Sequence, residues 1–336
     1  MRRALVVEQP GSLTLLERPG LEPGPGEVVV RPVFCGVCGS DLELIRGEID
    51  PAFVRYPLTL GHEWSGTVEA VGEGVEGVVP GQRCVSEGIV PCGRCRQCLA
   101  GATNVCEVYD EIGFTREGAA GDQMLVPARI VHPLAEQVEL LDAALMEPAA
   151  VVFTGLEKIG LRQDERVLVI GDGAIALLAT LLVSLSSPRE LHVSGRRAEQ
   201  AELAASVGAG SFSASGPPAP PYDLVVEAAG QVASVEAAVD AARRGGRVLL
   251  LGLPPAGGRI SFPADLLVNN DLTVAASFGY TSATWAGAVE LLNTGRIAPG
   301  RIVTHRFPIE RFAEAFGALV STAGARGKVL LEVADG

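Results

Sequence analysis

The residues best suited to chemistry lie between Gly36 and Glu63, a stretch that opens with G-V-C-G-S-D and closes with G-H-E. Cys, His and Glu side chains are zinc ligands, and two loops bracketed by Gly can bring a thiolate and an imidazole to one ion while a coordination position stays open. The alternative is a buried Cys38 and a solvated His62 that never meet. Three further features of the chain favour the metal site.

The first feature is a group of four cysteines with the spacing C-x2-C-x2-C-x7-C, all within fifteen residues. Such thiols cannot easily pair as disulfides, but they can surround one ion tetrahedrally and leave no open position. The pattern predicts a structural zinc that does no chemistry, and the alternative is a reduced, thiol-rich loop. The residues are Cys92, Cys95, Cys98 and Cys106. We interpret the remaining Cys35 and Cys84 as small buried hydrophobic residues.

The second feature is a glycine-rich turn, G-x-G-x-x-A, that runs from Gly171 to Ala176. It follows a strand-like segment at 166–170 and precedes a helical pattern, and another strand-like segment at 190–194 comes about twenty residues later. In this setting the turn is a dinucleotide fingerprint whose helix N-terminus receives the pyrophosphate. The residues predicted to bind the cofactor here are Gly171, Gly173, Ala174 and Ile175.

The choice between NAD and NADP depends on the end of the second strand, which reads H-V-S-G-R-R. NAD enzymes usually place an acidic residue there to bind the ribose 2′-hydroxyl, and this chain has none. Ser194 and Gly195 leave room for a 2′-phosphate, and Arg196 and Arg197 supply charge for it, so the sequence favours NADP. The alternative is that both Arg are solvated at a helix start and NAD is bound without an acidic partner.

Length and composition predict an ordinary globular chain: 336 residues, 48% hydrophobic and 20% charged, allow two domains and a large core. The net charge of −13 argues against nucleic-acid and anionic-membrane partners.

The apolar run at 167–185 has the length of a membrane span, but Gly171-Asp172-Gly173 interrupts it. A start without a secretion signal, together with seven Cys better suited to metals than to disulfides, leads us to expect a cytoplasmic protein.

Hydrophobic patterning divides the chain into two domains. Residues 1–149 show short Val-rich strands between Gly and Pro turns, which predicts a mostly antiparallel β domain. Residues 150–279 alternate strands and helices, which predicts a doubly wound parallel sheet, and 280–336 should pack back onto the first domain. The Ser-Gly-Pro-rich connection at 208–222 stands where such folds carry another strand and helix, so we expect an abbreviated sheet there.

The third feature is Glu147-Pro148, and together these motifs resemble the zinc-containing medium-chain dehydrogenases over essentially the whole chain. The chain is most similar to the polyol branch of sorbitol, threonine and glucose dehydrogenases, because a Glu followed by Pro stands where yeast and liver alcohol dehydrogenases place a ligand Cys. The resemblance implies an α/β protein with a GroES-like catalytic domain, a Rossmann domain and an active site in the cleft between them. It also implies a homodimer or homotetramer.

The resemblance implies roles for individual residues. Cys38, His62 and Glu147 would be the protein ligands of a catalytic zinc, in addition to the structural zinc of the four cysteines, so two zinc ions per chain are expected. Glu63 would be a neighbouring carboxylate or an alternate ligand. Ser40 occupies the position whose hydroxyl takes the proton from the bound alcohol.

Three positions have alternative interpretations. Ser40 and Glu43 also form a capping-box pattern for the following helix. Glu43 stands where many relatives carry a proton-passing His; either its carboxylate performs that step or it is only the cap partner, and we expect the second. Trp64 either narrows the substrate pocket or packs in the core.

The implied activity is hydride transfer between NAD(P) and a secondary alcohol or ketone of a polyol, sugar or aminocyclitol, so a small hydroxylated substrate is expected. One alternative is a reductase of small aldehydes or ketones, and another is a non-catalytic nucleotide sensor. Intact Cys38, His62, Glu147 and Ser40 argue against the sensor, because a sensor does not need an open zinc site.

Overall fold

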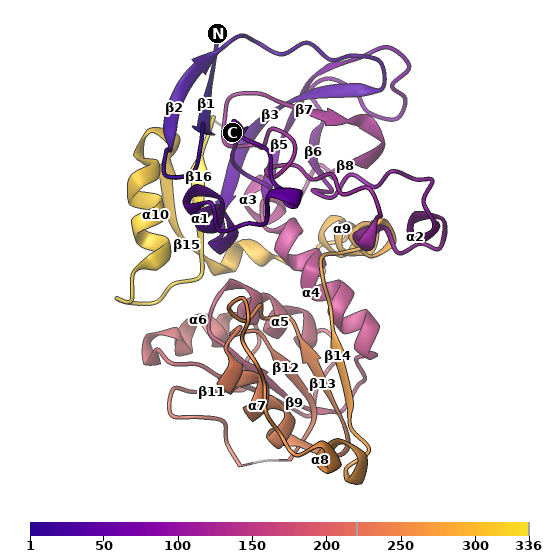
Figure 1. Cartoon of the computed structure of the whole chain (residues 1–336), viewed down its shortest axis with the longest axis vertical. Coiled ribbons are helices and arrows are strands. Elements are labelled where there is room, and N and C mark those ends of the chain that lie inside the picture. The colour runs from indigo at the N-terminus through magenta and orange to yellow at the C-terminus, as the bar shows by residue number, and fades with distance from the viewer. Residues whose placement is uncertain (220, 335–336) are drawn as a thin grey trace. The chain divides into compact units, whose positions relative to one another are not determined.

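The computed structural model describes residues 1–219 and 221–334, which form two compact units (Figure 1). Unit 1 consists of Met1–Glu147, Thr281–Thr322 and Lys328–Gly336, the last two residues of which lie outside the described ones. Unit 2 consists of Pro148–Tyr280 and Ala323–Gly327. The expectation that all of 280–336 joins the first domain is therefore wrong for Tyr280 and for the short segment Ala323–Gly327.

Unit 1 is built on two sheets. The larger has the order β15-β16-β3-β5-β6-β8, and β7 joins it by pairing with β3. The smaller has the order β2-β1-β4. The strands are β1 (Arg2–Val7), β2 (Thr14–Arg18), β3 (Glu27–Val37), β4 (Leu58–Thr59), β5 (Trp64–Val71), β6 (Arg83–Ser86), β7 (Met124–Pro127), β8 (Val131–Pro133), β15 (Val303–Pro308) and β16 (Lys328–Glu332). Every pair is antiparallel except β15 with β16, which confirms the mostly antiparallel β domain.

The helices of unit 1 connect these strands. They are α1 (Gly39–Arg46), α2 (Arg96–Leu99), α3 (Leu140–Ala143), α9 (Ser282–Asn293) and α10 (Phe312–Val320). Helix α10 was not predicted; it lies between the parallel strands β15 and β16 and packs on both. Parallel neighbours require a crossover connection, and a helix is its usual form, so α10 allows β16 to re-enter the sheet beside β3.

Unit 2 is a six-stranded, fully parallel sheet with the order β11-β10-β9-β12-β13-β14. Its strands are β9 (Arg166–Ile170), β10 (Glu190–Ser194), β11 (Ser211–Ser213), β12 (Tyr222–Glu227), β13 (Ala242–Leu250) and β14 (Thr273–Ala276). The helices that accompany them are α4 (Met146–Ile159), α5 (Ala174–Ser184), α6 (Ala201–Ser206), α7 (Val232–Ala241) and α8 (Ala264–Asn269). In chain order the strands are arranged 3-2-1-4-5-6, the order of the dinucleotide-binding fold, which confirms the predicted Rossmann sheet.

The connection at 208–222 is only partly abbreviated. The strand that the sequence analysis omitted is present as β11, which pairs parallel with β10. Among the described residues no helix separates β11 from β12. A three-residue strand whose sequence is S-F-S contains a single apolar residue, so it is too short and too polar to produce a periodic signal.

The apolar run at 167–185 forms buried β9 and α5, with a turn between them, as predicted. Along the part of the chain that the structure describes, none of the helices combines the length and apolar character needed to cross a bilayer.

The end of α4 is fixed by a buried arginine of β13. Gly160 adopts a left-handed φ of 73° after the last turn of the helix, as a C-terminal glycine should. The Arg247 guanidinium donates to the carbonyl of Ile159 at 3.1 Å and to that of Gly160, and it pairs with Glu165. Arg247 and Glu165 are both buried, so this ion pair cannot be replaced by water when one partner is lost.

We expect Arg247→Met to reduce the free energy of unfolding by about 3–5 kcal/mol, because a buried carboxylate and two carbonyl groups lose their donor. Urea unfolding followed by circular dichroism measures this change. Arg243→Met is the matched control and should cost no more than about 1 kcal/mol, since the Arg243 side chain is 43% exposed and Asp223, with which it pairs at 2.5 Å, keeps the Arg166 N–H as a donor. Equal losses of unfolding free energy in the two variants would contradict the stabilising role of the buried Arg247.

Candidate active site and metal centres

Cys38 and His62 come together because β3 and β5 are antiparallel neighbours. Cys35 of β3 lies opposite Trp64 of β5, so the residues just after β3 and just before β5 meet at one edge of the sheet. One donor atom each from Cys38, His62 and Glu63 lies within 4.8 Å of the others. The alternative in which Cys38 and His62 never meet is therefore wrong.

Asp41 connects these two donors. Its Oδ2 accepts the Cys38 N–H at 2.8 Å, and its Oδ1 lies 3.6 Å from His62 Nδ1, with both side chains buried. Burial opposes a charge on His62, but the neighbouring Asp41 and Cys38 outweigh it and raise the pKa of His62 well above its ordinary value. The carboxylate therefore lies behind the imidazole, where metal-binding histidines commonly have an acceptor, but at 3.6 Å it is too far away for a hydrogen bond.

The start of α1 differs from the sequence prediction. The helix is capped by Cys38 with Asp41, so Ser40 lies inside the first turn and Glu43 lies further along the helix. The predicted Ser40–Glu43 capping box is therefore wrong, and so is the role of Glu43 as a cap partner. The helix begins earlier because Cys38, at the end of an extended strand, already has the extended backbone of an N-cap residue.

Glu63 is held by a residue that the sequence analysis missed. Lys328, the first residue of β16, forms a buried ion pair with Glu63. Burial opposes the charge on Lys328, but attraction from Glu63 and Cys38 prevails and raises the pKa of the lysine. A lysine at the start of a strand normally indicates a solvated side chain, so no sequence signal points to this pair. The role of Glu63 as an alternate ligand stays a prediction.

Glu147 is the second residue of α4 and lies in the electric field of the same cluster. Burial raises the pKa of Glu147 to about 8, and nearby carboxylates, including Glu63, add to the shift, whereas His62 and Lys328 oppose it. Its carboxylate is outside the group of donors that lie within 4.8 Å of one another, so its role as third ligand stays a prediction. A site in which acidic groups and a thiol outnumber the cations fits a divalent ion, which would favour the ionised carboxylate.

The four-cysteine lobe has the geometry of a closed metal site. All four sulfurs lie within 4.8 Å of one another, and the Cys92–Cys98 and Cys95–Cys106 pairs are each 4.0 Å apart. Tetrahedral Zn–S bonds of about 2.3 Å require sulfur separations of about 3.8 Å. All seven cysteines of the chain are free thiols.

Backbone N–H groups point at these sulfurs. Cys98 donates to Cys95 Sγ, Cys92 to Cys106 Sγ and Val108 to Cys106 Sγ, each at 3.4 Å. Hydrogen bonds from the N–H groups of Cys98 and Glu107 lower the pKa of Cys95 to about 6. Donors directed at sulfur stabilise thiolates, which are the ligand form that zinc requires.

The remaining residues near Cys38 and His62 are structural. Trp64 is buried in the core of unit 1, so the core interpretation holds rather than the narrowed pocket. Cys35 and Cys84 belong to the same core, as predicted, and burial raises the pKa of both thiols. The Phe114 ring is tilted against His62, with 5.2 Å between the ring centroids.

The glycine-rich turn of unit 2 has the form that a pyrophosphate needs. Gly171 has a φ of 133°, and a Cβ there would lie 3.0 Å from the carbonyl of Ala228, so only glycine fits. Gly173 is the N-cap of α5, and a Cβ there would meet no atom within 4 Å. Ala174 and Ile175 form the first turn of α5. The predicted residues therefore leave open space above a helix N-terminus.

The predicted phosphate-binding residues gather at the end of β10, but one of them already has a partner. Ser194 is buried, Arg196 is exposed, and Arg197 Nη2 lies 2.9 Å from Asp172 Oδ1. Asp172 is the middle residue of the glycine-rich turn, and the sequence analysis gave it no role. A Cβ on Gly195 would lie 2.6 Å from that of Asp172, so position 195 cannot carry a side chain in this arrangement.

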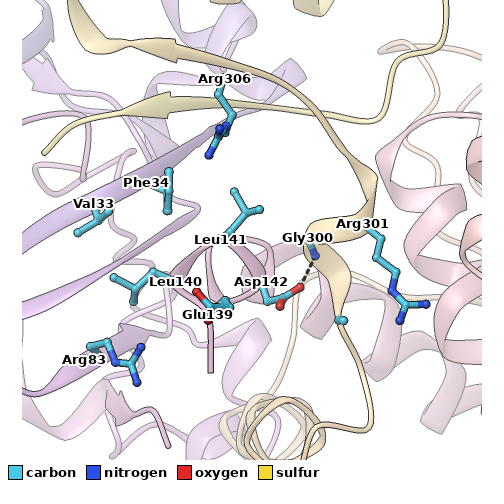
Figure 2. Close-up of a pocket in the computed structure, with 11 residues that line it drawn as sticks. Val33, Phe34, Arg83, Glu139, Leu140, Leu141, Asp142, Gly300, Arg301 and Arg306 are labelled. Atoms are coloured by element: carbon cyan, nitrogen blue, oxygen red, sulfur yellow. Dashed lines mark hydrogen bonds between the residues drawn. The ribbon is translucent and has the colours of Figure 1, made fainter. Parts of the chain in front are cut away.

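Unit 1 also contains a cavity of about 640 Å³ that none of the predicted ligands lines (Figure 2). In Figure 2, Arg306 of β15 points toward Phe34 and Leu141, and Asp142 accepts the N–H of Gly300 at 2.6 Å. The cavity is therefore distinct from the Cys38–His62 cluster, and the Asp142 bond ties α3 to the turn before β15.

Comparisons with known proteins identify the family. Residues 24–136 match the alcohol dehydrogenase GroES-like domain, and residues 142–322 match the glucose dehydrogenase C-terminus. The chain is 30% identical to the sorbitol dehydrogenase of Halalkalibacterium halodurans, over 99% of this chain and 100% of that protein. The chain belongs to the zinc-containing medium-chain dehydrogenases. It is an oxidoreductase of the zinc- and NAD(P)-dependent type, as the resemblance implied.

Solved structures of other dehydrogenases have the same fold. A zinc-binding dehydrogenase from Sinorhizobium meliloti 1021, bound to NADP, is 29% identical with a TM-score of 0.93 and covers 99% of both chains. The alcohol dehydrogenase rspB from Escherichia coli CFT073, in complex with NADH, is 26% identical with a TM-score of 0.90 and covers 98% of this chain and 99% of that one. Relatives with this dehydrogenase fold thus bind either dinucleotide.

We expect mutations at the two predicted metal sites of the dehydrogenase to have different effects. Cys38→Ala should remove one zinc and abolish turnover while the fold persists, because its site has an open position and does not cross-link the lobe. Cys95→Ala should remove the other zinc and unfold the lobe at 91–106, because that metal is the lobe's main cross-link. Metal analysis, thermal unfolding and limited proteolysis measure these outcomes. An unchanged digest of Cys95→Ala, or equal thermal losses in both variants, would count against this division.

Proposed function

We propose that this dehydrogenase oxidises a secondary alcohol of a polyol, sugar or aminocyclitol, or reduces the corresponding ketone. The observation that carries the proposal is the cluster of half-buried Cys38 with buried His62 and Glu63, whose donors lie within 4.8 Å of one another. Glu147, which precedes Pro148, completes the ligand set of the polyol branch, and the sorbitol dehydrogenase relative supports the same substrate class.

The expected zinc ligands and Asp41 have separate roles in this reaction. A zinc ion held by Cys38, His62 and Glu147 would polarise the substrate oxygen as a Lewis acid. Asp41 Oδ1 lies 3.6 Å from His62 Nδ1, and its carboxylate would accept the Nδ1 proton when the imidazole holds zinc. The second zinc would be held by the four-cysteine lobe and would only stabilise it. Free thiols at all seven cysteines support a reducing compartment such as the cytoplasm.

Ser40 takes the proton from the substrate hydroxyl in this proposal. It lies in the first turn of α1, two residues after the ligand Cys38. In residues 1–219 and 221–334 its hydroxyl has no hydrogen-bond partner, so it can bond to a substrate oxygen. Glu43 lies one turn further along α1, and we assign the onward step to water rather than to its carboxylate.

The dinucleotide is NADP in preference to NAD in this proposal, and when bound it would supply the acceptor or donor of the hydride. The second Rossmann strand ends in Ser194 and Gly195, without the acidic residue that binds a ribose 2′-hydroxyl. Arg196 and Arg197 follow at once and supply positive charge. The absence of space for a side chain at Gly195 agrees with a site that has no carboxylate there.

A homodimer is supported by the surface of unit 2. Strand β14 is an edge of the six-stranded sheet, and an edge strand exposes backbone groups that can pair with a second copy. Exposed large apolar side chains occur in the segment that contains β14: Leu253, Ile260, Val268, Val274 and Phe278. Such an accumulation is typical of an interaction surface.

The function is tested by measuring NADP and NAD reduction over a panel of polyols, sugars, aminocyclitols and threonine, and reductase activity on small aldehydes. We expect the highest kcat/KM on a secondary alcohol of the polyol class. With that substrate, Ser40→Ala should lower kcat by about 10²–10⁴-fold with unchanged zinc content, because only the proton acceptor is lost.

Ser40→Thr, which restores a hydroxyl, is the matched control and should recover part of the rate. The proposed proton transfer is rejected if Ser40→Ala retains the wild-type kcat and pH profile. A chain that reduces small aldehydes far faster than it oxidises any polyol would be a reductase instead.

The oligomer is tested with Val268→Asp/Phe278→Asp, which places two charges on the apolar surface of unit 2. We expect the wild type to sediment as a multiple of the 34.8 kDa chain and the variant to shift toward a single chain. Val320→Asp, at an exposed position of unit 1, is the control and should leave the mass unchanged. Analytical ultracentrifugation decides this, and an unshifted double variant would exclude this surface.

A further inference from the structure

The end of β10 has no acidic side chain of its own, but a carboxylate from the neighbouring turn lies beside it. A Cβ on Gly195, the first residue after β10, would lie 2.6 Å from the Cβ of Asp172 and 2.9 Å from its Oδ2. Asp172 belongs to the glycine-rich turn that follows β9, and β9 and β10 are parallel neighbours. The Asp172 carboxylate therefore occupies the space that a side chain at position 195 would need.

That space has a defined function in dinucleotide-binding sheets. An Asp or Glu at the end of the second strand accepts a hydrogen bond from the ribose 2′-hydroxyl of NAD, beyond the carboxyl ends of the strands. The second strand of this sheet in chain order is β10, and the first is β9. Asp172 reaches the same place from the end of the first strand. The carboxylate that position 195 lacks is thus supplied by the adjacent turn.

Hydrogen bonds hold the Asp172 carboxylate in this place. Its Oδ2 accepts the N–H groups of Arg196 at 2.8 Å and of Arg197 at 3.0 Å. Burial opposes its charge, but the Arg197 side chain and these N–H groups outweigh burial and lower the pKa of Asp172. The carboxylate is therefore ionised at neutral pH, and the loop that follows β10 fixes its orientation.

Arg197 neutralises this carboxylate without saturating it. The Arg197 Nη2 donates to Asp172 Oδ1 at 2.9 Å and to the Asp172 carbonyl at 3.0 Å. A carboxylate oxygen can accept two hydrogen bonds, and within residues 1–219 and 221–334 Oδ1 accepts only this one. The Asp172 side chain also keeps 12% of its surface exposed. Oδ1 thus retains an acceptor position for a hydroxyl group.

The same carboxylate opposes a 2′-phosphate. A phosphate monoester carries a charge of about −1.5 to −2 at neutral pH, so a neighbouring carboxylate repels it. Arg197, which the sequence led us to expect as a phosphate ligand, is paired with Asp172 instead. Asp172 therefore acts against the phosphate in two ways, by its own charge and by its hold on Arg197.

We propose that Asp172 is a specificity residue for the dinucleotide, whose carboxylate accepts the ribose 2′-hydroxyl and limits the affinity for a 2′-phosphate. This inference rests on the proposed binding of the dinucleotide at the glycine-rich turn. The two arginines after β10 favour NADP, and Asp172 reduces that preference and preserves the binding of NAD. An acidic residue was expected only at the end of β10, so Asp172 was given no role from the sequence.

Three nucleotides that differ only at the 2′ position test this role: 2′,5′-ADP, 5′-AMP and 2′-deoxy-5′-AMP. None of them requires zinc or turnover, and isothermal titration calorimetry of the full chain gives a Kd for each. The wild type should bind 5′-AMP about tenfold more tightly than 2′-deoxy-5′-AMP, because only the former donates a hydrogen bond to an ionised group.

Asp172→Asn removes the charge and keeps the shape of the side chain. It should reduce the difference between 5′-AMP and 2′-deoxy-5′-AMP to less than about threefold, because the acceptor is no longer ionised. It should also tighten the binding of 2′,5′-ADP by about tenfold, because the repulsion is lost and Arg197 is released. The melting temperature and retained binding of 2′-deoxy-5′-AMP show that the variant is folded.

Matched variants make the test specific. Asp240→Asn makes the same chemical change at an exposed position of α7, just before β13 begins and so at the opposite edge of the sheet, and should leave all three affinities unchanged. Arg197→Ala leaves Asp172 without its cation and should weaken the binding of 2′,5′-ADP by about tenfold or more. The double variant Asp172→Asn/Arg197→Ala should recover most of that loss, because the repelling charge is gone.

The outcomes separate this inference from the preference for NADP. If the wild type binds 2′,5′-ADP no better than 5′-AMP, the preference for NADP fails, whereas a shift toward 2′,5′-ADP in Asp172→Asn still supports the role of Asp172. If the wild type prefers 2′,5′-ADP and Asp172→Asn leaves the ratio of the two Kd values unchanged, NADP remains the cofactor and the role of Asp172 is overturned. An Asp172→Asn variant that distinguishes 5′-AMP from 2′-deoxy-5′-AMP as strongly as the wild type would also overturn it.

Discussion

The buried ion pair between Glu63 and Lys328 is the constraint on which unit 1 depends. An ionised carboxylate inside a β core costs several kcal/mol unless a well-placed cation and hydrogen bonds compensate it. Glu63 follows the metal-donor His62 directly, so the carboxylate cannot move to the surface without moving the imidazole. The compensating cation comes from β16, far along the chain, so the chain must return to unit 1 after unit 2. The pairing of β16 with β3 brings Lys328 to Glu63.

The same constraint determines where the backbone must be glycine. A Cβ on Gly36 would lie 2.9 Å from the Glu63 Cβ and 3.0 Å from Lys328 Cε, so a side chain there would displace the ion pair. Gly61 has a φ of 103°, and a Cβ there would lie 2.9 Å from the Ala120 nitrogen. The Gly residues that bracket the motif in the sequence are thus required by close packing around the donors, which is a physical reason for the pattern from which the site was predicted.

The parts that the sequence predicted are those encoded locally. The strand-turn-helix at Gly171 and the four-cysteine lobe are each contained in fewer than about twenty residues, and their chemistry follows from spacing alone. Lys328 could not be predicted, because its burial depends on the pairing of β16 with β3. Strand β11 was missed for lack of apolar residues, and the cap of α1 was misplaced because Ser40 fits the consensus better than Cys38. Of these cases, only that of Lys328 was decided by a contact of high sequence separation.

Asp172 places an acidic residue in the glycine-rich turn, and this changes how Arg197 is used. A carboxylate in a phosphate-binding turn opposes the ligand unless a cation neutralises it, and Arg197 is the cation that does so. Arg197, one of the two arginines expected from the sequence to bind a phosphate, is thereby paired within the protein. Arg326 belongs to unit 2 and Lys328, two residues later, belongs to unit 1. One short segment thus contains a cation that belongs to unit 2 and the cation that pairs with Glu63 in unit 1.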